Sequence, residues 1–371
     1  MAEERPNLRT AYRALDPTRP LDREALSTYY AQRPGDPIAK LANEIKERSQ
    51  PYCAIVAGQR GVGKTTELNR LKAELERAYE PVFLFDLGRV TTTNATTALA
   101  FLTKELALQT KALDISELVR KHAWLDWDFG ISGAVLQPTQ LTDVLGTFKT
   151  VVAAVQQKQG REVVLLLDGW ERVASDDENQ VYPFMDALER LNCSTVLVAR
   201  LSVILAPTFN RFTPDWDLTV LPAITLFTYD RSNRDEAGWS LLRTALEKRA
   251  GDRAFLPDAL RMIIQTSGGL FRELVSLARH ACLLAERARQ DQVTTAEAEA
   301  ALTEQRLKLT ATLRLEEHGL LRQFSLQERK YPNQMIFEQI NQGRIVAYHR
   351  ETLWFDVHPI LWPLVDLKYP K

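Results

Sequence analysis

The stretch YCAIVAGQRGVGKTTEL, residues 52–68, decides the fold. Its first seven residues form a short apolar run, which is typical of a buried strand. Gly58 ends this run, Gly61 and Gly63 follow, and a helical pattern begins at Lys64 and continues to about residue 80. Residues 58–65 match the pattern GxxxxGK[ST] at every fixed position. The order of strand, glycine-rich loop and helix is the context in which this pattern binds phosphate.

Each residue type in this loop has a chemical reason to bind a nucleotide. The glycines let backbone N–H groups turn inward around phosphate oxygens, and the positive end of the following helix points at the same anion. Lys64 can reach the β- and γ-phosphates, and the Thr65 hydroxyl can ligate Mg²⁺. A glycine-rich turn with a solvated lysine is the alternative. We predict ATP and Mg²⁺ as cofactors, bound by Gly58, Gln59, Arg60, Gly61, Val62, Gly63, Lys64, Thr65 and Thr66.

A second acidic group is needed to organise the metal, and the run VVLLLD at 163–168 supplies it. Five apolar residues place Asp168 at the carboxyl end of a strand, where ligands bind in such sheets. We expect Asp168 to hold Mg²⁺ through water, opposite Thr65; the alternative is a turn aspartate that caps the next helix. Many P-loop ATPases carry a Glu directly after this Asp, but Gly169 stands here. The next acid, Glu171, is therefore our candidate base, and a surface glutamate paired with an arginine is the alternative.

Further apolar runs lie at 81–87, 161–169 and 194–200, and they alternate with helical patterns. Continuous apolar runs indicate strands covered on both faces, as in parallel sheets. We predict an α/β fold: a P-loop NTPase parallel sheet sandwiched by helices, then a helical lid and a small winged-helix-like C-terminal domain. The expected divisions are an N-terminal extension (1–50), the P-loop ATPase core (51–230), the lid (231–310) and the winged-helix-like domain (311–371), which contains a predicted hairpin around 349–352.

The order of these motifs resembles that of the AAA+ ATPases, including their STAND relatives and the origin-recognition ATPases. GQRGVGKTTEL resembles their Walker A motif, and VVLLLDGWERV resembles Walker B in the DGxx form common in STAND-type proteins. STVLVAR resembles the sensor 1 strand, APTFNRF the arginine-finger region and SGGLFRELVSLA the sensor 2 region.

This resemblance implies roles for three arginines. Arg200 would stand at the sensor 1 strand end, where the wider family has Asn or Thr and the STAND branch often has Arg. Arg211 would reach the nucleotide of a neighbouring subunit, and Arg272 would contact the γ-phosphate from the lid. A guanidinium suits phosphate because it stays charged and binds oxygens bidentately. The alternative for each is a surface salt bridge.

The resemblance also implies a function: an ATPase (ATP + H₂O to ADP + phosphate), slow or stimulated by a partner, that switches conformation or assembly with nucleotide state. Such proteins work as homo-oligomers or with an effector protein, and STAND-like members often act in signalling or anti-phage defence. Two alternatives stay open. One is a DNA-associated AAA+ loader or transposition-type regulator. The other is a partner subunit that binds ATP without hydrolysing it. This alternative stays open because Gly169 stands where many P-loop ATPases carry a Glu.

Composition limits the remaining classes. The 371 residues are 45% hydrophobic and 26% charged, which excludes a mainly disordered or coiled-coil chain. Formal charge is −1, and residues 311–371 hold eight Lys or Arg and seven Asp or Glu. This balance does not support nucleic-acid binding and favours a protein-docking or autoinhibitory C-terminal domain. Three separated cysteines and a charged N-terminus without a long apolar run predict a cytoplasmic protein with no membrane association.

Overall fold

The computed structural model describes residues 8–77, 82–90, 94–129, 136–170, 178–206, 209, 216–326, 329 and 333–369. The chain divides into two compact units. The first, here called the sheet unit, comprises Pro37–Ala57 and Lys64–Val220. The second, here called the helical unit, comprises Met1–Asp36, Gly58–Gly63 and Leu221–Lys371.

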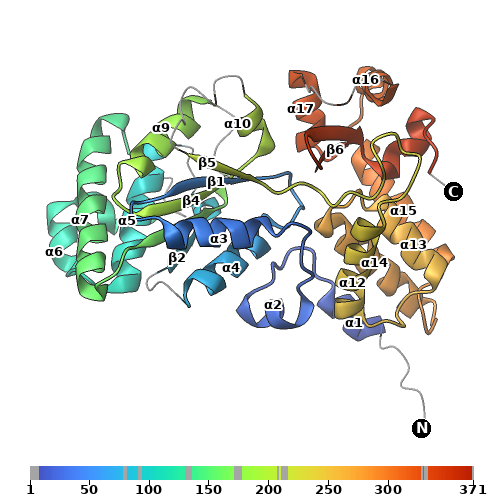
Figure 1. Ribbon diagram of the computed structural model, residues 1–371, viewed down its shortest axis with the longest axis horizontal. Coiled ribbons are helices and arrows are strands. Elements are labelled where there is room, and N and C mark those ends of the chain that lie inside the picture. The colour runs from blue at the N-terminus through green and yellow to red at the C-terminus, as the bar shows by residue number, and fades with distance from the viewer. Residues whose placement is uncertain are drawn as a thin grey trace, which may run out of the picture. The chain divides into compact units, whose positions relative to one another are not determined.

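A five-stranded parallel sheet forms the centre of the sheet unit, in the order β2-β3-β4-β1-β5 (Figure 1). β1, β3 and β4 are buried along their whole length, as the continuous apolar runs predict. The four predicted strands are all present. The fifth strand, β5, was not predicted. The strands span Val82–Asp86 (β2), Val164–Asp168 (β3), Ser194–Ala199 (β4), Cys53–Ala57 (β1) and Asp217–Val220 (β5).

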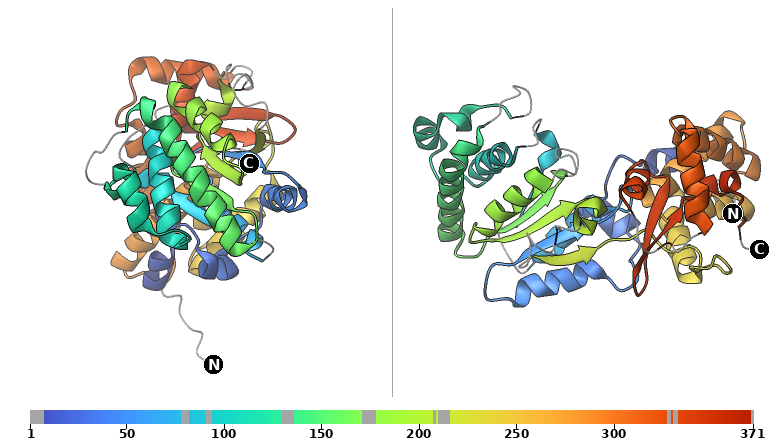
Figure 2. Two further views of the ribbon diagram at one scale, coloured as in Figure 1. Left: turned by 90° about the vertical axis from the view of Figure 1, so that its left-hand side faces the viewer. Right: turned by 90° about the horizontal axis from the view of Figure 1, so that it is seen from above.

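Helices cover both faces of this sheet, as the predicted fold class requires (Figure 2, right). On one face α3 contacts α4, and on the other face α5 packs against α7 and α9. The helices are α3 (Pro37–Glu47), α4 (Lys64–Leu75), α5 (Ala95–Thr110), α7 (Leu141–Gln159) and α9 (Glu178–Glu189), with the shorter α6 (Ile115–Lys121), α10 (Leu201–Leu205), η1 (Leu87–Arg89), η2 (Ala123–Asp126) and η3 (Pro138–Gln140) between them.

Strand register fixes what lies at the carboxyl edge of the sheet. Asp168 ends β3 and pairs in register with Asp86, which ends β2. Ala57 ends β1 and pairs with Ala199 at the end of β4. Arg200 follows directly, so Asp168 and Arg200 leave the sheet at the edge where β1 also ends. This is the edge where parallel sheets bind ligands.

The helical unit contains the predicted lid as four helices: α12 (Glu236–Ala250), α13 (Pro257–Thr266), α14 (Phe271–Arg287) and α15 (Thr295–Thr310). Near the N-terminus α1 (Leu8–Ala14) packs against α12 and α14 and buries Leu8 and Ala11, while α2 (Arg23–Tyr29) contacts α12. The first helix of the predicted N-terminal extension is therefore part of the same unit as the lid.

The C-terminal part of this unit contains the predicted hairpin. Helices α16 (Leu315–Leu326) and α17 (Gln334–Asn341) precede the antiparallel strands β6 (Ile345–His349) and β7 (Leu353–Val357), and η4 (Pro359–Val365) follows. A buried ion cluster holds the hairpin: Asp356 on β7 accepts hydrogen bonds from Arg231 at 2.7 and 2.9 Å and from Arg329 at 2.5 Å. Asp356 is 2% exposed, so both arginines compensate a charge removed from water.

The three cysteines, Cys53, Cys193 and Cys282, are buried, and burial raises the pKa of Cys193 and Cys282 to about 12. Among the described helices, none is long and apolar enough to cross a membrane.

Candidate nucleotide-binding site

The glycine-rich loop adopts a backbone that side chains would obstruct. Gly61 and Gly63 have φ angles of +94° and +96°, in the region that favours glycine. At Gly58, a Cβ would come within 2.6 Å of the Leu221 carbonyl oxygen. The two fixed glycines of the sequence pattern, Gly58 and Gly63, and also Gly61 at an open position of the pattern, are therefore needed for the shape of the loop.

Two backbone carbonyls of the loop accept hydrogen bonds from other parts of the helical unit. The Arg272 N–H, at the start of α14, donates to the Gly61 carbonyl at 3.1 Å. This bond satisfies one of the N–H groups that a helix leaves unpaired at its N-terminus. The Arg33 guanidinium donates to the carbonyl of Val62. The lid and the N-terminal segment thus both hold the loop.

Arg33 is a residue whose role sequence reasoning missed. Its side chain is 5% exposed, lies over the Phe271 ring at 5.1 Å, and also donates to the Pro222 carbonyl at 3.1 Å. It thereby links the loop to the first residue of α14. The only local signal was the turn sequence RPGDP at 33–37, which does not indicate a long-range partner.

Gln59, the second residue of the loop, has its side chain in the C-terminal hairpin. Its Nε2 donates to the carbonyls of Ile345 at 2.7 Å and Ile340 at 3.0 Å, and its Oε1 accepts from the Ala347 N–H at 3.1 Å. Gln59 is 4% exposed. The Gln59 backbone remains part of the predicted phosphate loop, while its side-chain amide is hydrogen-bonded to the backbone of residues 340–347.

In the sheet unit, α4 begins at Lys64, so its positive end lies where the predicted loop ends. Lys64 is 6% exposed. The Thr65 hydroxyl donates to Asp168 Oδ2 at 2.7 Å, and Asp168 Oδ1 accepts from the Gly169 N–H at 2.8 Å. The two predicted metal-site residues, 103 positions apart, are therefore in direct contact.

This pair fits Mg²⁺ chemically. Mg²⁺ takes oxygen ligands, keeps several waters and is held by one or two protein groups plus substrate phosphates. A hydroxyl and a carboxylate within hydrogen-bond distance, at the end of a strand and the start of a helix, match that requirement. The described residues contain no cluster of three or more His, Cys, Asp or Glu side chains that could hold a metal.

The arginines predicted from the resemblance have different outcomes. Arg272 lies beside the loop: a Cβ added at Gly61 would meet the Arg272 Cβ at 3.2 Å. Arg200 directly follows β4 at the carboxyl edge of the sheet. Arg211 and the candidate base Glu171 lie outside the described residues.

Glu273 is an acid near the loop that sequence reasoning did not single out. Burial raises its pKa, while a 2.6 Å hydrogen bond from Gln305 and the charges of Arg272 and Arg60 oppose that rise. It follows Arg272 in α14, so the lid brings both a cation and a carboxyl group to the side of the loop.

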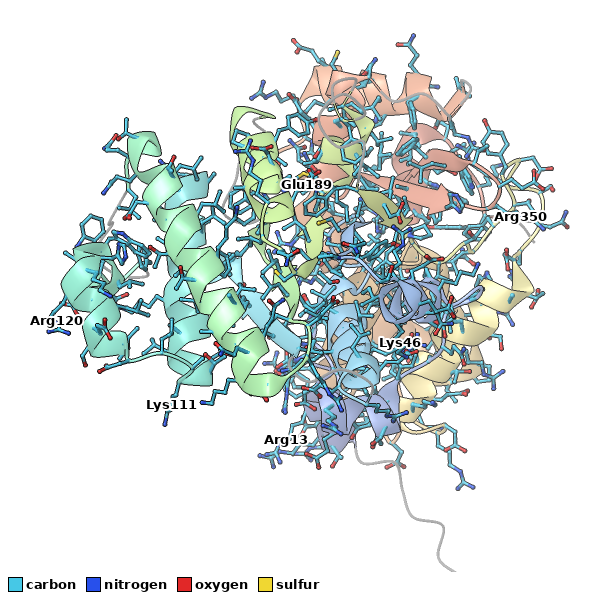
Figure 3. The ribbon with its side chains drawn as sticks, turned by 60° about the vertical axis from the view of Figure 1, so that its left-hand side comes forward. Arg13, Lys46, Lys111, Arg120, Glu189 and Arg350 are labelled. Atoms are coloured by element: carbon cyan, nitrogen blue, oxygen red, sulfur yellow. The ribbon has the colours of Figure 1, made fainter. Side chains whose placement is uncertain are left out.

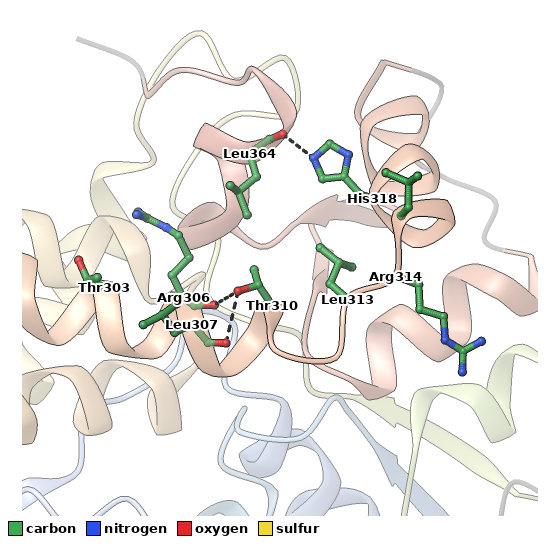
Figure 4. A pocket seen from close by; sticks show the side chains of 9 residues that line it. Thr303, Arg306, Leu307, Thr310, Leu313, Arg314, His318 and Leu364 are labelled. Carbon is green, nitrogen blue, oxygen red and sulfur yellow. Dashed lines mark hydrogen bonds between the residues drawn. The ribbon is translucent and has the colours of Figure 1, made fainter.

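A groove of about 500 Å³ lies elsewhere in the helical unit, between α15, α16 and η4 (Figure 4). None of the residues predicted for the nucleotide site lines it. Its lining is mostly apolar, with His318 Nε2 at 2.9 Å from the Leu364 carbonyl. The lining residues are Thr303, Arg306, Leu307, Thr310, Leu313, Arg314, Leu315, His318 and Leu364.

Comparison with known proteins agrees with this site. Residues 35–198 match the family model of the AAA ATPase domain. That segment includes the whole glycine-rich loop, Thr65 and Asp168.

The structure is similar to two solved structures from Aeropyrum pernix, and it has their origin-recognition-like AAA+ fold. One is the ORC2 protein in ADPNP–ADP complexes, with 16% identity over 95% of this chain and 96% of that chain and a TM-score of 0.52. The other is the ORC1 protein in complex with DNA, with 15% identity over 96% of both chains and a TM-score of 0.53. No curated protein resembles this sequence closely enough to count as a match.

Proposed function

We propose that the protein is an ATP-dependent molecular switch that binds ATP with Mg²⁺, hydrolyses it and changes conformation or assembly with nucleotide state. The observation that carries this proposal is the 2.7 Å contact between the Thr65 hydroxyl and Asp168. It joins the end of the Walker A motif to the Walker B acid, in a segment that matches the AAA ATPase domain.

The residues of this chain have distinct tasks in that proposal. Backbone N–H groups of the glycine-rich loop and the N-terminus of α4 bind the phosphates, and Lys64 supplies a positive charge to the β- and γ-phosphates. Thr65 and Asp168 would hold the metal, Thr65 directly and Asp168 through water. Bound Mg²⁺ would neutralise charge that develops on the phosphates.

Hydrolysis also requires an oriented water and stabilised charge at the γ-phosphate. Glu171 is the proposed base, and Arg200, Arg272 and Arg211 are the proposed cationic contacts. Arg211 would act on the nucleotide of a neighbouring subunit, which makes assembly an activating step. An arginine supplied in this way accelerates phosphoryl transfer by ~10³–10⁵ in other enzymes.

The switch follows from the contact between loop and lid. The Arg272 backbone N–H donates to the Gly61 carbonyl, so a change in the conformation of the lid would be coupled to a change in the conformation of the loop. A nucleotide that binds one of two lid states more tightly shifts the population toward that state. We propose that the readout is assembly into a homo-oligomer or a complex with an effector protein, in a STAND-like signalling or anti-phage defence system.

A DNA-associated loader is the second candidate, because one similar structure is that of an ORC1 protein in complex with DNA. Charge does not favour it. In Figure 3 the exposed cations Lys111, Arg120 and Arg350 come from the end of α5, from α6 and from the hairpin turn. Binding to duplex DNA that weakens steeply with salt would support this candidate.

ATP turnover measured against protein concentration, with native mass determined with and without ATP and Mg²⁺, tests the proposal. Turnover per subunit that rises as the protein assembles supports a site completed by a neighbour. Arg211→Ala should then still bind ATP but lose the concentration dependence. Tight ATP binding without turnover or assembly would overturn the hydrolysing switch and favour a partner subunit that only binds ATP.

A further inference from the structure

The edge of strand β6 is paired with a side chain of the phosphate loop. The Gln59 amide donates to the Ile345 carbonyl at 2.7 Å and accepts from the Ala347 N–H at 3.1 Å. In a parallel ladder the N–H and the C=O of one residue bond in the same way to the residues before and after the one opposite it. The Gln59 amide thus takes the place of the N–H and C=O of a strand residue opposite Val346.

The same amide also contacts the end of a helix. Gln59 Nε2 donates to the carbonyl of Ile340, one of the last residues of α17, where helix carbonyls lack partners within the helix. One buried side chain therefore connects α17 and β6, two elements of the C-terminal domain, to the loop. A buried amide with all three bonds formed is costly to displace, because each group would otherwise lose a partner away from water.

Gln59 also fixes the backbone of the loop. Its carbonyl accepts a hydrogen bond from the Val62 N–H at 3.4 Å, which closes a turn over residues 59–62. Gly61 lies inside this turn with its φ of +94°. Holding the Gln59 side chain therefore holds the first residue of the turn whose N–H groups would face the phosphates.

A second contact connects the hairpin to the same loop through the lid. The Tyr348 hydroxyl on β6 donates to the Gly268 carbonyl at 3.0 Å, and Gly268 lies in the turn just before α14. From the start of α14, Arg272 donates to the Gly61 carbonyl at 3.1 Å. The hairpin thus reaches the loop directly through Gln59 and indirectly through the lid turn.

We propose that Gln59 is a positioning residue that couples the phosphate loop to the C-terminal hairpin. Its amide holds the loop in the form that binds ATP, and it transmits nucleotide occupancy to β6. The proposal rests on ATP binding by the loop, as proposed above. Because coupling is reciprocal, a hairpin that favours the binding form of the loop must itself be stabilised when ATP binds.

Two variants of the full-length protein separate coupling from general stability. Gln59→Met keeps the length of the side chain and removes all three hydrogen bonds. Gln339→Met is the matched control: Gln339 is 1% exposed in the same C-terminal domain and hydrogen-bonds to Glu317 and Arg344 through its amide, but not to the loop. ATP affinity is measured by titration calorimetry, and hydrogen exchange is followed in residues 345–349 with and without ATP and Mg²⁺.

In the wild type we expect ATP to slow exchange in residues 345–349, with the Ala347 N–H as the direct reporter. Gln59→Met should weaken ATP binding by about 5–150-fold, a common range for coupled sites, and should abolish the effect of ATP on exchange in the hairpin. Gln339→Met should keep both properties, even where it lowers the melting temperature.

Unchanged ATP affinity in folded Gln59→Met, or equal losses in both variants, would overturn the coupling. If Gln59→Met does not fold, the wild type decides alone: ATP binding without any change in hairpin exchange would also overturn it. Failure of the proposed function gives a different result, because the wild type itself would then bind no ATP, and the coupling would fall with it.

Discussion

Lowering the pH should destabilise the helical unit through His358. This residue follows β7, is 1% exposed, and accepts the Ile360 N–H at 3.2 Å on its Nδ1. Its Nε2 has no hydrogen-bond partner among the described residues and sits against Gly268, where an added Cβ would come within 3.0 Å. Burial lowers the pKa of His358 from 6.5 to about 3, so the folded protein holds it neutral.

The sign and size of the effect follow from linkage. Because the folded pKa is depressed, the stabilising contribution is present above the unfolded pKa and is lost as the pH falls below it. At pH 5 the unfolded chain binds a proton at His358 and the folded chain does not. Each pH unit below the unfolded pKa costs about 1.4 kcal/mol, so moving from pH 7.5 to pH 5 costs about 2 kcal/mol.

Urea unfolding at the two pH values, followed by circular dichroism, measures this loss in the wild type and in His358→Asn. Asn can still cap η4 by accepting the Ile360 N–H, but it does not titrate. The wild type should lose about 2 kcal/mol more than the variant between pH 7.5 and pH 5. Equal losses in both proteins would refute the assignment of His358 as a buried neutral imidazole.

Five other substitutions, two of them matched controls, test the packing and the metal site. Gly269→Ala should lower the free energy of unfolding by at least ~3 kcal/mol, because its φ is +74° and a Cβ would lie 1.9 Å from a backbone carbonyl oxygen. Gly319→Ala, where an added Cβ would meet nothing within 4 Å, should be neutral or stabilising when urea unfolding is used to measure both glycine variants. Asp356→Asn should cost about 3–5 kcal/mol in urea unfolding by leaving the buried Arg329 and the half-buried Arg231 without their carboxylate; a loss no larger than at an exposed aspartate would contradict that cluster. Asp168→Asn should raise the Mg²⁺ concentration needed for ATP turnover by ~10–100-fold, whereas Asp86→Asn, at the matching end of β2, should leave it unchanged.

The parts of the fold that depend on contiguous sequence were predictable. The apolar run before Gly58 is β1, and the helical pattern from Lys64 is α4. The sequence predicted the position of Asp168 at a strand end because the apolar run at 163–167 stops directly before it, and β3 indeed ends at Asp168. Parallel topology brings the carboxyl ends of β1 and β3 to the same edge of the sheet, with β4 between them, and there Thr65 meets Asp168.

The fifth strand shows where this reasoning fails. β5 has only four residues, Asp217–Val220, and none of them is fully buried. It pairs with β1 alone and therefore lies at the edge of the sheet, where a strand is less buried. Its sequence has no continuous apolar run that would distinguish it from a loop. Tertiary pairing, rather than local pattern, makes this segment a strand.

The residues that hold the loop were likewise hidden from sequence analysis. Gln59 pairs with residues more than 280 positions away, and Arg33 pairs with Pro222 across 189 positions. A glutamine in GxxxxGK[ST] fills a position that the pattern leaves open, so its type carries no local signal. Only the three-dimensional structure indicates that these two side chains act on the loop.

Equilibrium binding of ATP with Mg²⁺ to the wild type and to Lys64→Ala tests the central claim most directly. Calorimetric titration should show binding by the wild type and affinity weaker by about 10–150-fold in the variant, the range expected for losing a hydrogen bond to a charged group. Circular dichroism should show the same secondary structure in both proteins. Equal affinity in a folded Lys64→Ala protein, or no binding by the wild type, would contradict the assignment of residues 58–66 as the nucleotide-binding loop.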